Sequence, residues 1–232
     1  MAVRRRPRRA APPRRLPFYV YALLDAPVVL PRVTGARLEI VEAGEFFVAG
    51  ERRRRPALSE RALRRQHDIV TRIGRAADAV LPVRFGTVVS PSELEALLAP
   101  RTRVLRRAFR AVRGRVQMTT RWYGPSPARA TVLPPTSGRD YLRARAAAAR
   151  PVLPPAADAV RAAVRSLADA ERIDPGRGDV QVSVHHLVRR ERLTRYLERL
   201  EVALARCTPA PTLSLSGPWP PFAFTPDLWD VD

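Results

Sequence analysis

Two short segments constrain the fold more than any other part of the sequence, because proline, glycine and aromatic residues interrupt an apolar run in each. The first is residues 81–89, LPVRFGTVV, and the second is residues 216–224, SGPWPPFAF. Proline fixes its own φ angle and lacks a backbone donor, and glycine permits turns, so these insertions set the path of the backbone. We expect residues 81–89 to form a core strand closed by a turn at Gly86.

The second segment has two open interpretations. Its three prolines favour an extended, polyproline-like path, and Trp219, Phe222 and Phe224 add large apolar area to it. The segment is either a C-terminal arm that packs on its own domain or an aromatic anchor for another protein, since a buried tryptophan is a common hot spot of protein interfaces.

The charge of the chain does not by itself identify a partner. The 232 residues carry a formal net charge of +20, which is typical of proteins that bind nucleic acids or anionic membranes. However, all 42 basic residues are arginine, and the chain contains no lysine and no asparagine. Codon choice in a GC-rich genome would produce this pattern without selection for binding. Residues 1–15 hold seven arginines and no acid, and we expect them to be a disordered tail.

The first half of the chain predicts an α+β sandwich, with helices on one face of a largely antiparallel sheet. Residues 18–24 are apolar at both odd and even positions, as in a central strand that is covered on both faces. Residues 36–41 and 45–49 flank Gly44 as a hairpin. The remaining predicted elements are a helix from Ser59 to about Asp78, a helix that starts with a capping box at residues 90–93 and is interrupted at Pro100, a helix ending at Gly114, and a strand over residues 116–122.

The second half predicts a smaller α+β domain. Residues 124–136 hold four prolines and mark a domain junction. Beyond it the patterns predict a helix from Ser137 to Pro151, a helix with Val160, Val164, Leu167 and Glu171 on one face, a turn at Pro175, a strand over residues 180–188, a helix over residues 193–204 and a strand over residues 213–215. The predicted organisation is a tail (1–15), an N-terminal domain (16–123), the junction (124–136) and a C-terminal domain with its arm (137–232).

Few residues suggest catalysis or metal binding. His67 precedes Asp68, but it shares a helix face with Leu63 and is better explained as a histidine at the edge of the core. His185 and His186 point to opposite faces of a strand, so they do not join Cys207 in a metal site. No glycine-rich phosphate loop is present. We therefore expect no enzyme activity, no cofactor and no metal.

The single Cys207 excludes an intramolecular disulfide, as expected for a protein of the reducing cytoplasm. No stretch approaches the roughly 18 apolar residues that a membrane span needs. We expect a cytoplasmic protein without a membrane partner.

The ordered motifs of the chain resemble those of the gas vesicle protein F/L family (GvpF/GvpL). The resemblance rests on residues 19–21, YVY, residues 67–70, HDIV, residues 81–87, LPVRFGT, residues 137–142, SGRDYL, and residues 216–222, SGPWPPF. It covers nearly the whole chain after the tail. Two features depart from the family pattern, namely Gln117, where family members often carry an acid, and the Arg-rich tail.

The resemblance implies an N-terminal domain, a ferredoxin-like C-terminal domain and a non-enzymatic role in gas vesicle assembly. Its implied partner is the hydrophobic shell protein GvpA, with other gas vesicle accessory proteins as further candidates, and its implied location is the cytoplasm and the gas vesicle. As partner-binding residues we predict Arg84, Phe85, Gly86, Thr87, Trp219 and Phe222. The alternative is a basic nucleic-acid-binding module of ferredoxin-like fold, for which the net charge and the tail are the motivation.

Overall fold

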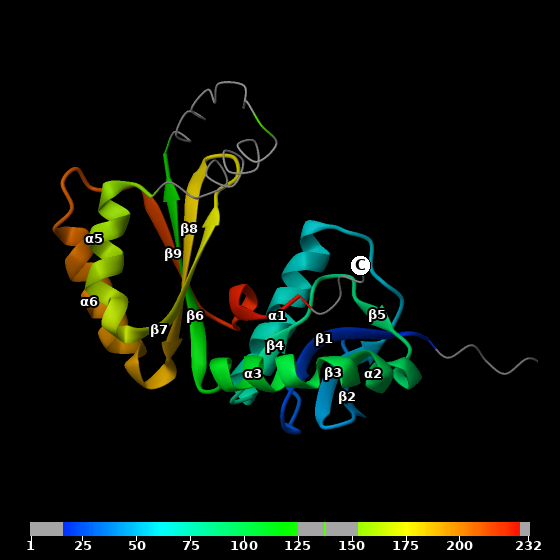
Figure 1. Cartoon of the computed structure of the whole chain (residues 1–232). Coiled ribbons are helices and arrows are strands. Elements are labelled where there is room, and N and C mark those ends of the chain that lie inside the picture. Colours follow the sequence, from blue (N-terminus) through cyan, green and yellow to red (C-terminus); the bar gives the residue numbers. More distant parts are fainter. Residues whose placement is uncertain (1–15, 125–136, 138–152, 228–232) are drawn as a thin grey trace, which may run out of the picture.

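The computed structural model describes residues 16–124, 137 and 153–227, which form two antiparallel sheets with helices packed against them (Figure 1). The first sheet has the order β2-β3-β1-β4, and β5 also pairs with β1. Its elements are β1 (Phe18–Leu24), β2 (Leu38–Ala43), β3 (Phe46–Arg52), α1 (Glu60–Ala76), β4 (Val80–Pro82), β5 (Val88–Val89), α2 (Pro91–Leu98), the short 3-10 helix η1 (Ala99–Arg101) and α3 (Thr102–Val112).

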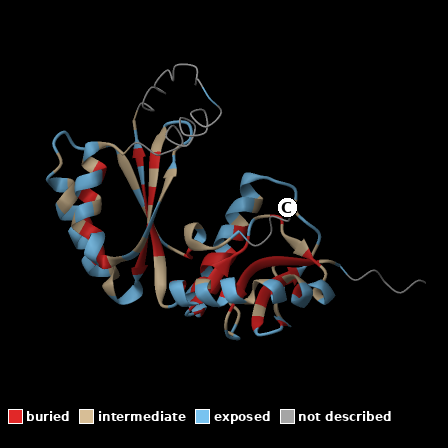
Figure 2. Cartoon of the chain, viewed as in Figure 1, coloured by how far each residue is buried: buried red, intermediate tan, exposed pale blue. Residues whose placement is uncertain are grey.

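Helices cover both faces of the first sheet, whereas the sequence predicted helices on one face. All seven residues of β1 are buried (Figure 2). On one face, Phe18 and Val20 join a core with residues of α2 and α3. On the other face, Tyr19 and Tyr21 pack with Ile69 and other residues of α1. β1 is apolar at both odd and even positions because neither of its faces is exposed to solvent.

Local sequence signals set the helix ends as predicted. The Ser59 side chain accepts a hydrogen bond from the backbone N–H of Ala62 at 3.2 Å and so caps α1. At α2, the Glu93 carboxylate accepts from the backbone N–H of Ser90 at 3.3 Å, which is half of the predicted capping box. After α3 the chain turns at Gly114 with φ of +66°, a value that favours glycine.

The second sheet has the order β7-β8-β6-β9. Its elements are β6 (Arg115–Tyr123), α5 (Pro155–Val164), η2 (Arg165–Leu167), β7 (Ala168–Pro175), β8 (Val180–Arg189), η3 (Arg190–Arg192), α6 (Leu193–Ala205), β9 (Leu213–Trp219) and η4 (Phe222–Phe224). The helices α5 and α6 lie on the face turned away from the first sheet (Figure 1). The predicted strand over residues 116–122 is present, but as an inner strand of this second sheet. The boundary between the part of the chain that forms the first sheet and the part that forms the second therefore lies between α3 and β6.

The strand β7 is a correction to the predicted pattern. The sequence placed Glu171 on a helix with Val160, but the helix ends at Val164 and Glu171 lies in β7. β7 is an edge strand of sequence ADAERIDP, and its charges give little β propensity, as is common at sheet edges. The predicted helix from Ser137 to Pro151 lies outside the described residues, apart from Ser137 itself.

Side chains of the second half, residues 115–227, are built into the first half, residues 16–114. Arg190, the first residue of η3, donates to the backbone carbonyls of Gly74 at 2.6 Å and of Ala77 at 3.0 Å, at the C-terminal end of α1. Leu187 of β8 belongs to the core formed by β1, α2 and α3. In the part of the chain that the structure describes, no helix is long and apolar enough to span a membrane.

Candidate functional site

The segment after β4 forms a tight turn at residues 84–87. The Arg84 carbonyl accepts hydrogen bonds from the backbone N–H of Thr87 at 3.3 Å and from its side-chain hydroxyl at 2.9 Å. Gly86 has φ of +86°, and a Cβ at this position would lie 2.6 Å from Nε of Arg55. The positive φ favours glycine, as predicted for this turn, whereas the contact is with the end of the flexible Arg55 side chain, which can move aside.

Two buried side chains hold this turn against the first sheet. The Tyr19 hydroxyl accepts the backbone N–H of Gly86 at 3.0 Å and donates to the Gln66 side-chain carbonyl. The Gln66 amide in turn donates to the Val83 carbonyl at 2.9 Å. Burial raises the pKa of Tyr19, so its hydroxyl stays protonated and available as a donor. The strand β1 and helix α1 thus set the position of residues 83–86.

Tyr19→Phe is expected to lower the free energy of unfolding by about 1–2 kcal/mol, because it leaves the Gly86 N–H without its acceptor and the Gln66 carbonyl without its donor. Hydrogen exchange of the Gly86 amide should become faster. The control is Tyr123→Phe, which removes an exposed hydroxyl 3.2 Å from Ser214. Unchanged exchange at Gly86 in Tyr19→Phe would contradict the role of this hydroxyl.

A buried carboxylate lies beside Tyr19 in the same sheet. Glu51 accepts hydrogen bonds from the Tyr21 hydroxyl at 2.6 Å and from Arg53 at 2.8 Å. Burial acts to raise the pKa of Glu51, but the hydrogen bonds from Tyr21 and Arg53 outweigh it, and the net effect is a lowered pKa. The carboxylate is thus kept ionised by its donors, as a structural group of this sheet.

The C-terminal arm, residues 220–227, packs on both halves of the molecule. The Ala223 N–H donates to the Gln117 side-chain carbonyl at 2.7 Å, and Arg172 donates to the Ala223 carbonyl at 2.9 Å. The His67 ring of α1 lies between the Trp219 ring, at 4.6 Å and edge-on, and the Phe222 ring, at 5.7 Å and stacked. The segment therefore packs within the chain, but not only on its own predicted domain, because Trp219 contacts His67 of the first half, and Phe222 remains 38% exposed.

The turn and the arm meet at one groove, of about 640 Å³, which we call the arm groove. Its floor and walls come from α1, the end of β4, the turn and the arm. Arg84 closes one rim through an ion pair of 3.2 Å with Asp227. The apolar side chains that line it are Leu63, Pro82, Val83, Phe85, Phe222 and Pro226. An apolar groove with charged residues at its rim can bind an apolar segment of another molecule.

The structure brings together some of the predicted binding residues and separates others. Arg84, Phe85 and Phe222 line the arm groove. Gly86 and Thr87 shape the turn but line a different hollow, with Leu16 and Pro17. The sixth, Trp219, contacts the His67 ring edge-on and lines a cavity on the second sheet, next to the groove.

Sequence reasoning missed two groove residues on α1. His67 was expected at the edge of the core, but it is exposed, and Leu63 one turn earlier is 45% exposed. The buried face of α1 instead carries Gln66, Ile69, Val70, Ile73 and Gly74. The spacing of Leu63 and His67 was the available signal, because residues four apart share a helix face.

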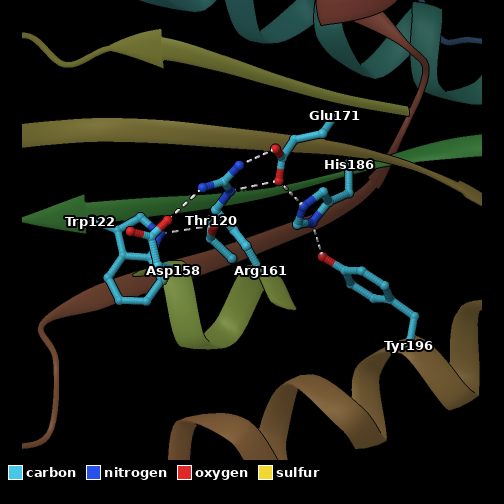
Figure 3. A network of polar contacts seen from close by, with 7 residues as sticks. All are labelled: Thr120, Trp122, Asp158, Arg161, Glu171, His186 and Tyr196. Carbon is cyan, nitrogen blue, oxygen red and sulfur yellow. Dashed lines mark hydrogen bonds and ion pairs between the residues drawn. The ribbon is translucent and has the colours of Figure 1, made fainter. Parts of the chain in front are cut away.

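A second polar network joins α5, β7, β8 and α6, away from the groove (Figure 3). The His186 ring is 2% exposed and lies 2.7 Å from the Tyr196 hydroxyl and 2.9 Å from the Glu171 carboxylate. Arg161 donates twice to Glu171, at 2.8 and 2.5 Å. As expected, His185 and His186 face opposite sides of β8, because His186 contacts α6 whereas His185 contacts Thr119.

Electrostatics indicates a structural role for this network. The hydrogen bond from Arg161 is the main reason why the pKa of Glu171 falls to about 2. Burial lowers the pKa of His186 and raises that of Tyr196. The network thus consists of an ionised Glu171, a neutral His186 and a protonated Tyr196, each of which has a partner. Among the described residues, no group of three His, Cys, Asp or Glu side chains is arranged to hold a metal ion.

Comparisons with known proteins agree with each other. The family model "Gas vesicle synthesis protein GvpL/GvpF" matches residues 17–226. The crystal structure of the gas vesicle protein GvpF from Anabaena sp. PCC7120 is similar, with a TM-score of 0.68 and 16% identity over 91% of this chain and 99% of that one. GvpF from Microcystis aeruginosa gives a TM-score of 0.68 and 15% identity over 90% of this chain and 98% of that one. No individually curated protein matched the sequence.

Proposed function

Because the chain belongs to the gas vesicle synthesis protein GvpL/GvpF family, we propose that it is a non-enzymatic assembly factor or minor component of the gas vesicle. In this proposal it binds the hydrophobic shell protein GvpA during nucleation and limits the aggregation of GvpA. The observation that carries the proposal is the family match over residues 17–226, which spans nearly all of the described structure.

The physical need for such a partner follows from the chemistry of a shell. A subunit that will bury apolar surface against its neighbours exposes that surface beforehand, and exposed apolar surface and unpaired strand edges promote aggregation. A protein that covers this surface transiently keeps the subunit available for assembly. Binding and release suffice for this role, and it requires no reacting group.

We propose the arm groove as the surface that takes an apolar segment of GvpA. Support comes from its lining, since Phe85 and Phe222 contribute aromatic side chains and Leu63 an exposed aliphatic one. Of the six predicted binding residues, Arg84, Phe85 and Phe222 would contact the partner. Gly86 and Thr87 would shape the turn, and Trp219 would hold the His67 ring in place through its edge-on contact.

The same proposal includes a two-domain organisation with a ferredoxin-like second domain. The elements of the second half follow the order β6-α5-β7-β8-α6-β9 in an antiparallel sheet ordered β7-β8-β6-β9, which supports a split βαβ arrangement. In this organisation β6 would be the first strand of the second domain. We propose the cytoplasm and the gas vesicle as the location, with other gas vesicle accessory proteins as further candidate partners.

Co-expression with GvpA from the same organism tests the proposal. The tagged full-length chain is expected to keep GvpA in the soluble fraction and to capture it after nuclease treatment in about 1 M salt, where the Debye length of about 3 Å screens nonspecific arginine contacts. Leu63→Asp, which places a charge in the arm groove, should reduce captured GvpA about tenfold or more, because an unpaired charge in an apolar contact is costly.

The matched control for Leu63→Asp is Val104→Asp. Val104 is also an aliphatic residue on a helix and is 50% exposed, compared with 45% for Leu63, but it does not line the groove. This variant should capture GvpA as the wild type does. Equal capture by both variants would exclude the groove as the binding surface. No capture by the wild type, together with nucleic acid retained at low salt, would favour the alternative of a nucleic-acid-binding module.

A further inference from the structure

A second cavity, of about 500 Å³, lies on the face of the second sheet that α5 and α6 leave open. We call it the sheet cavity. It is bounded by β6, β7, β8, β9, α1 and the arm, and its volume falls within the range of small-molecule sites. It adjoins the arm groove through His67, Arg172 and Phe222, but the residues on its floor are absent from the groove.

The floor of the sheet cavity is polar although it is buried. Gln117 is 5% exposed and Thr119 is 1% exposed. The Thr119 hydroxyl lies 3.0 Å from both the Gln117 amide and Nδ1 of His185, and the amide lies 3.3 Å from the same Nδ1. On the same face of β8, Leu187 is part of an apolar core, so the face changes from apolar to polar at His185. These side chains satisfy one another by hydrogen bonds, and the Gln117 carbonyl also accepts from the Ala223 N–H, so the cavity has a preformed polar floor.

Positive charge exceeds negative charge in the sheet cavity. Arg121 and Arg172 both line it, and Asp174 is the one carboxylate among its lining residues. Asp174 is already engaged, at 2.9 Å from Nε of Arg172 and 3.4 Å from Nε2 of His185. Burial lowers the pKa of His185, which favours the neutral ring. The excess is therefore carried by a guanidinium, not by the histidine.

Of the two arginines that line the sheet cavity, Arg121 is the one that forms no ion pair with a described carboxylate. Its hydrogen bond within the described structure is to the Ser216 hydroxyl at 3.3 Å, and no described carboxylate lies within 4.0 Å of it. A guanidinium presents a planar fork of donors that matches a phosphate or carboxylate group. The adjacent Ser216 hydroxyl supplies a further donor to the same position.

We propose that the sheet cavity binds a small organic oxyanion. Its phosphate or carboxylate group is held by Arg121 and Ser216, and its remaining atoms lie over the Gln117, Thr119 and His185 floor. Trp219 and Phe222 line the same cavity and cover the apolar part of the ligand. Phe222 of the arm therefore lines both the arm groove and the sheet cavity.

Calorimetric titration of the full-length chain with inorganic phosphate, and separately with succinate, tests this site. Saturable binding of phosphate alone assigns a phosphorylated ligand, and saturable binding of succinate alone assigns a carboxylate. Arg121→Gln should raise the dissociation constant about tenfold or more, as expected for loss of a charge-assisted hydrogen bond. Absence of saturable binding of either anion overturns the proposal.

Arg195→Gln is the matched control, because it removes the same charge from an exposed position on α6 outside the cavity. It should leave the dissociation constant unchanged. An equal loss of affinity in both variants would show that the anions bind through the overall net charge of +20 and not at the sheet cavity, and it would overturn the proposal. Because Arg121 is exposed, Arg121→Gln should leave the thermal unfolding midpoint unchanged. The same variant should still capture GvpA, so the two sites are tested separately.

Discussion

His186→Ala is expected to lower the free energy of unfolding by about 2–4 kcal/mol, measured by urea denaturation at pH 7. The His186 ring is buried between the Tyr196 hydroxyl and the Glu171 carboxylate (Figure 3). Its removal opens a cavity, leaves the Tyr196 hydroxyl buried without a partner and deprives Glu171 of one donor. Glu191→Ala, at a side chain that is 71% exposed, is the control and should change stability little.

The same variant should change how stability depends on pH. Burial lowers the pKa of His186 in the folded state, so below pH 6.5 the unfolded chain binds a proton that the folded chain does not. The wild type therefore loses stability as the pH falls through 6.5, and His186→Ala should lose less over this range. The contribution of Glu171, whose pKa is lowered from 4.5 to about 2, is present above pH 4.5 and is lost below it. A pH dependence identical to the wild type would contradict a buried neutral His186.

Gly50→Ala is expected to cost about 3 kcal/mol, at the upper end of overpacking effects. Gly50 lies in β3 opposite Val20 of β1, and a Cβ there would meet the Tyr19 carbonyl oxygen and lie 2.6 Å from the Phe18 ring. The carbonyl belongs to the central strand, so relief requires movement of β1 within its sheet. Chemical denaturation of the purified variant measures the loss.

Gly114→Ala separates this steric effect from the effect of backbone angle. Gly114 has a positive φ, but a Cβ there would meet no atom within 4 Å. Its substitution should cost about 1–2 kcal/mol, from the left-handed backbone alone. A smaller loss in Gly50→Ala than in Gly114→Ala would show that β1 and β3 separate easily.

The sequence predicted those elements whose signals are local. The capping residues Ser59 and Glu93 and the turn glycine Gly114 set helix ends through contacts with near neighbours. The uninterrupted apolar run of residues 18–24 gave the central strand of the first sheet. β7 was missed because an edge strand needs little apolar alternation, and because Glu171 continued the helical spacing of Val160 by coincidence.

The candidate sites depend on contacts between distant residues, which periodicity does not report. Residues 81–89 and 216–224 stood out individually, but their meeting at one groove depends on the pairing of Gln117 with Trp219 and on the packing of α1 beside the arm. The polar floor of the sheet cavity could not be predicted from the sequence for the same reason. Gln117 and Thr119 are unremarkable in a strand, and only the pairing of β6 with β8 places Thr119 opposite His185.

Leu187 and Arg190 have a mechanical consequence. Leu187 is a side chain of the second sheet that completes the core of the first, and Arg190 is bonded to the end of α1. Any movement of one half against the other would therefore have to break the Arg190 hydrogen bonds and withdraw Leu187 from the core of the first half. The arm groove is lined by α1 and the end of β4 from the first half and by Arg172 and the arm from the second, so its shape depends on how the two halves are joined.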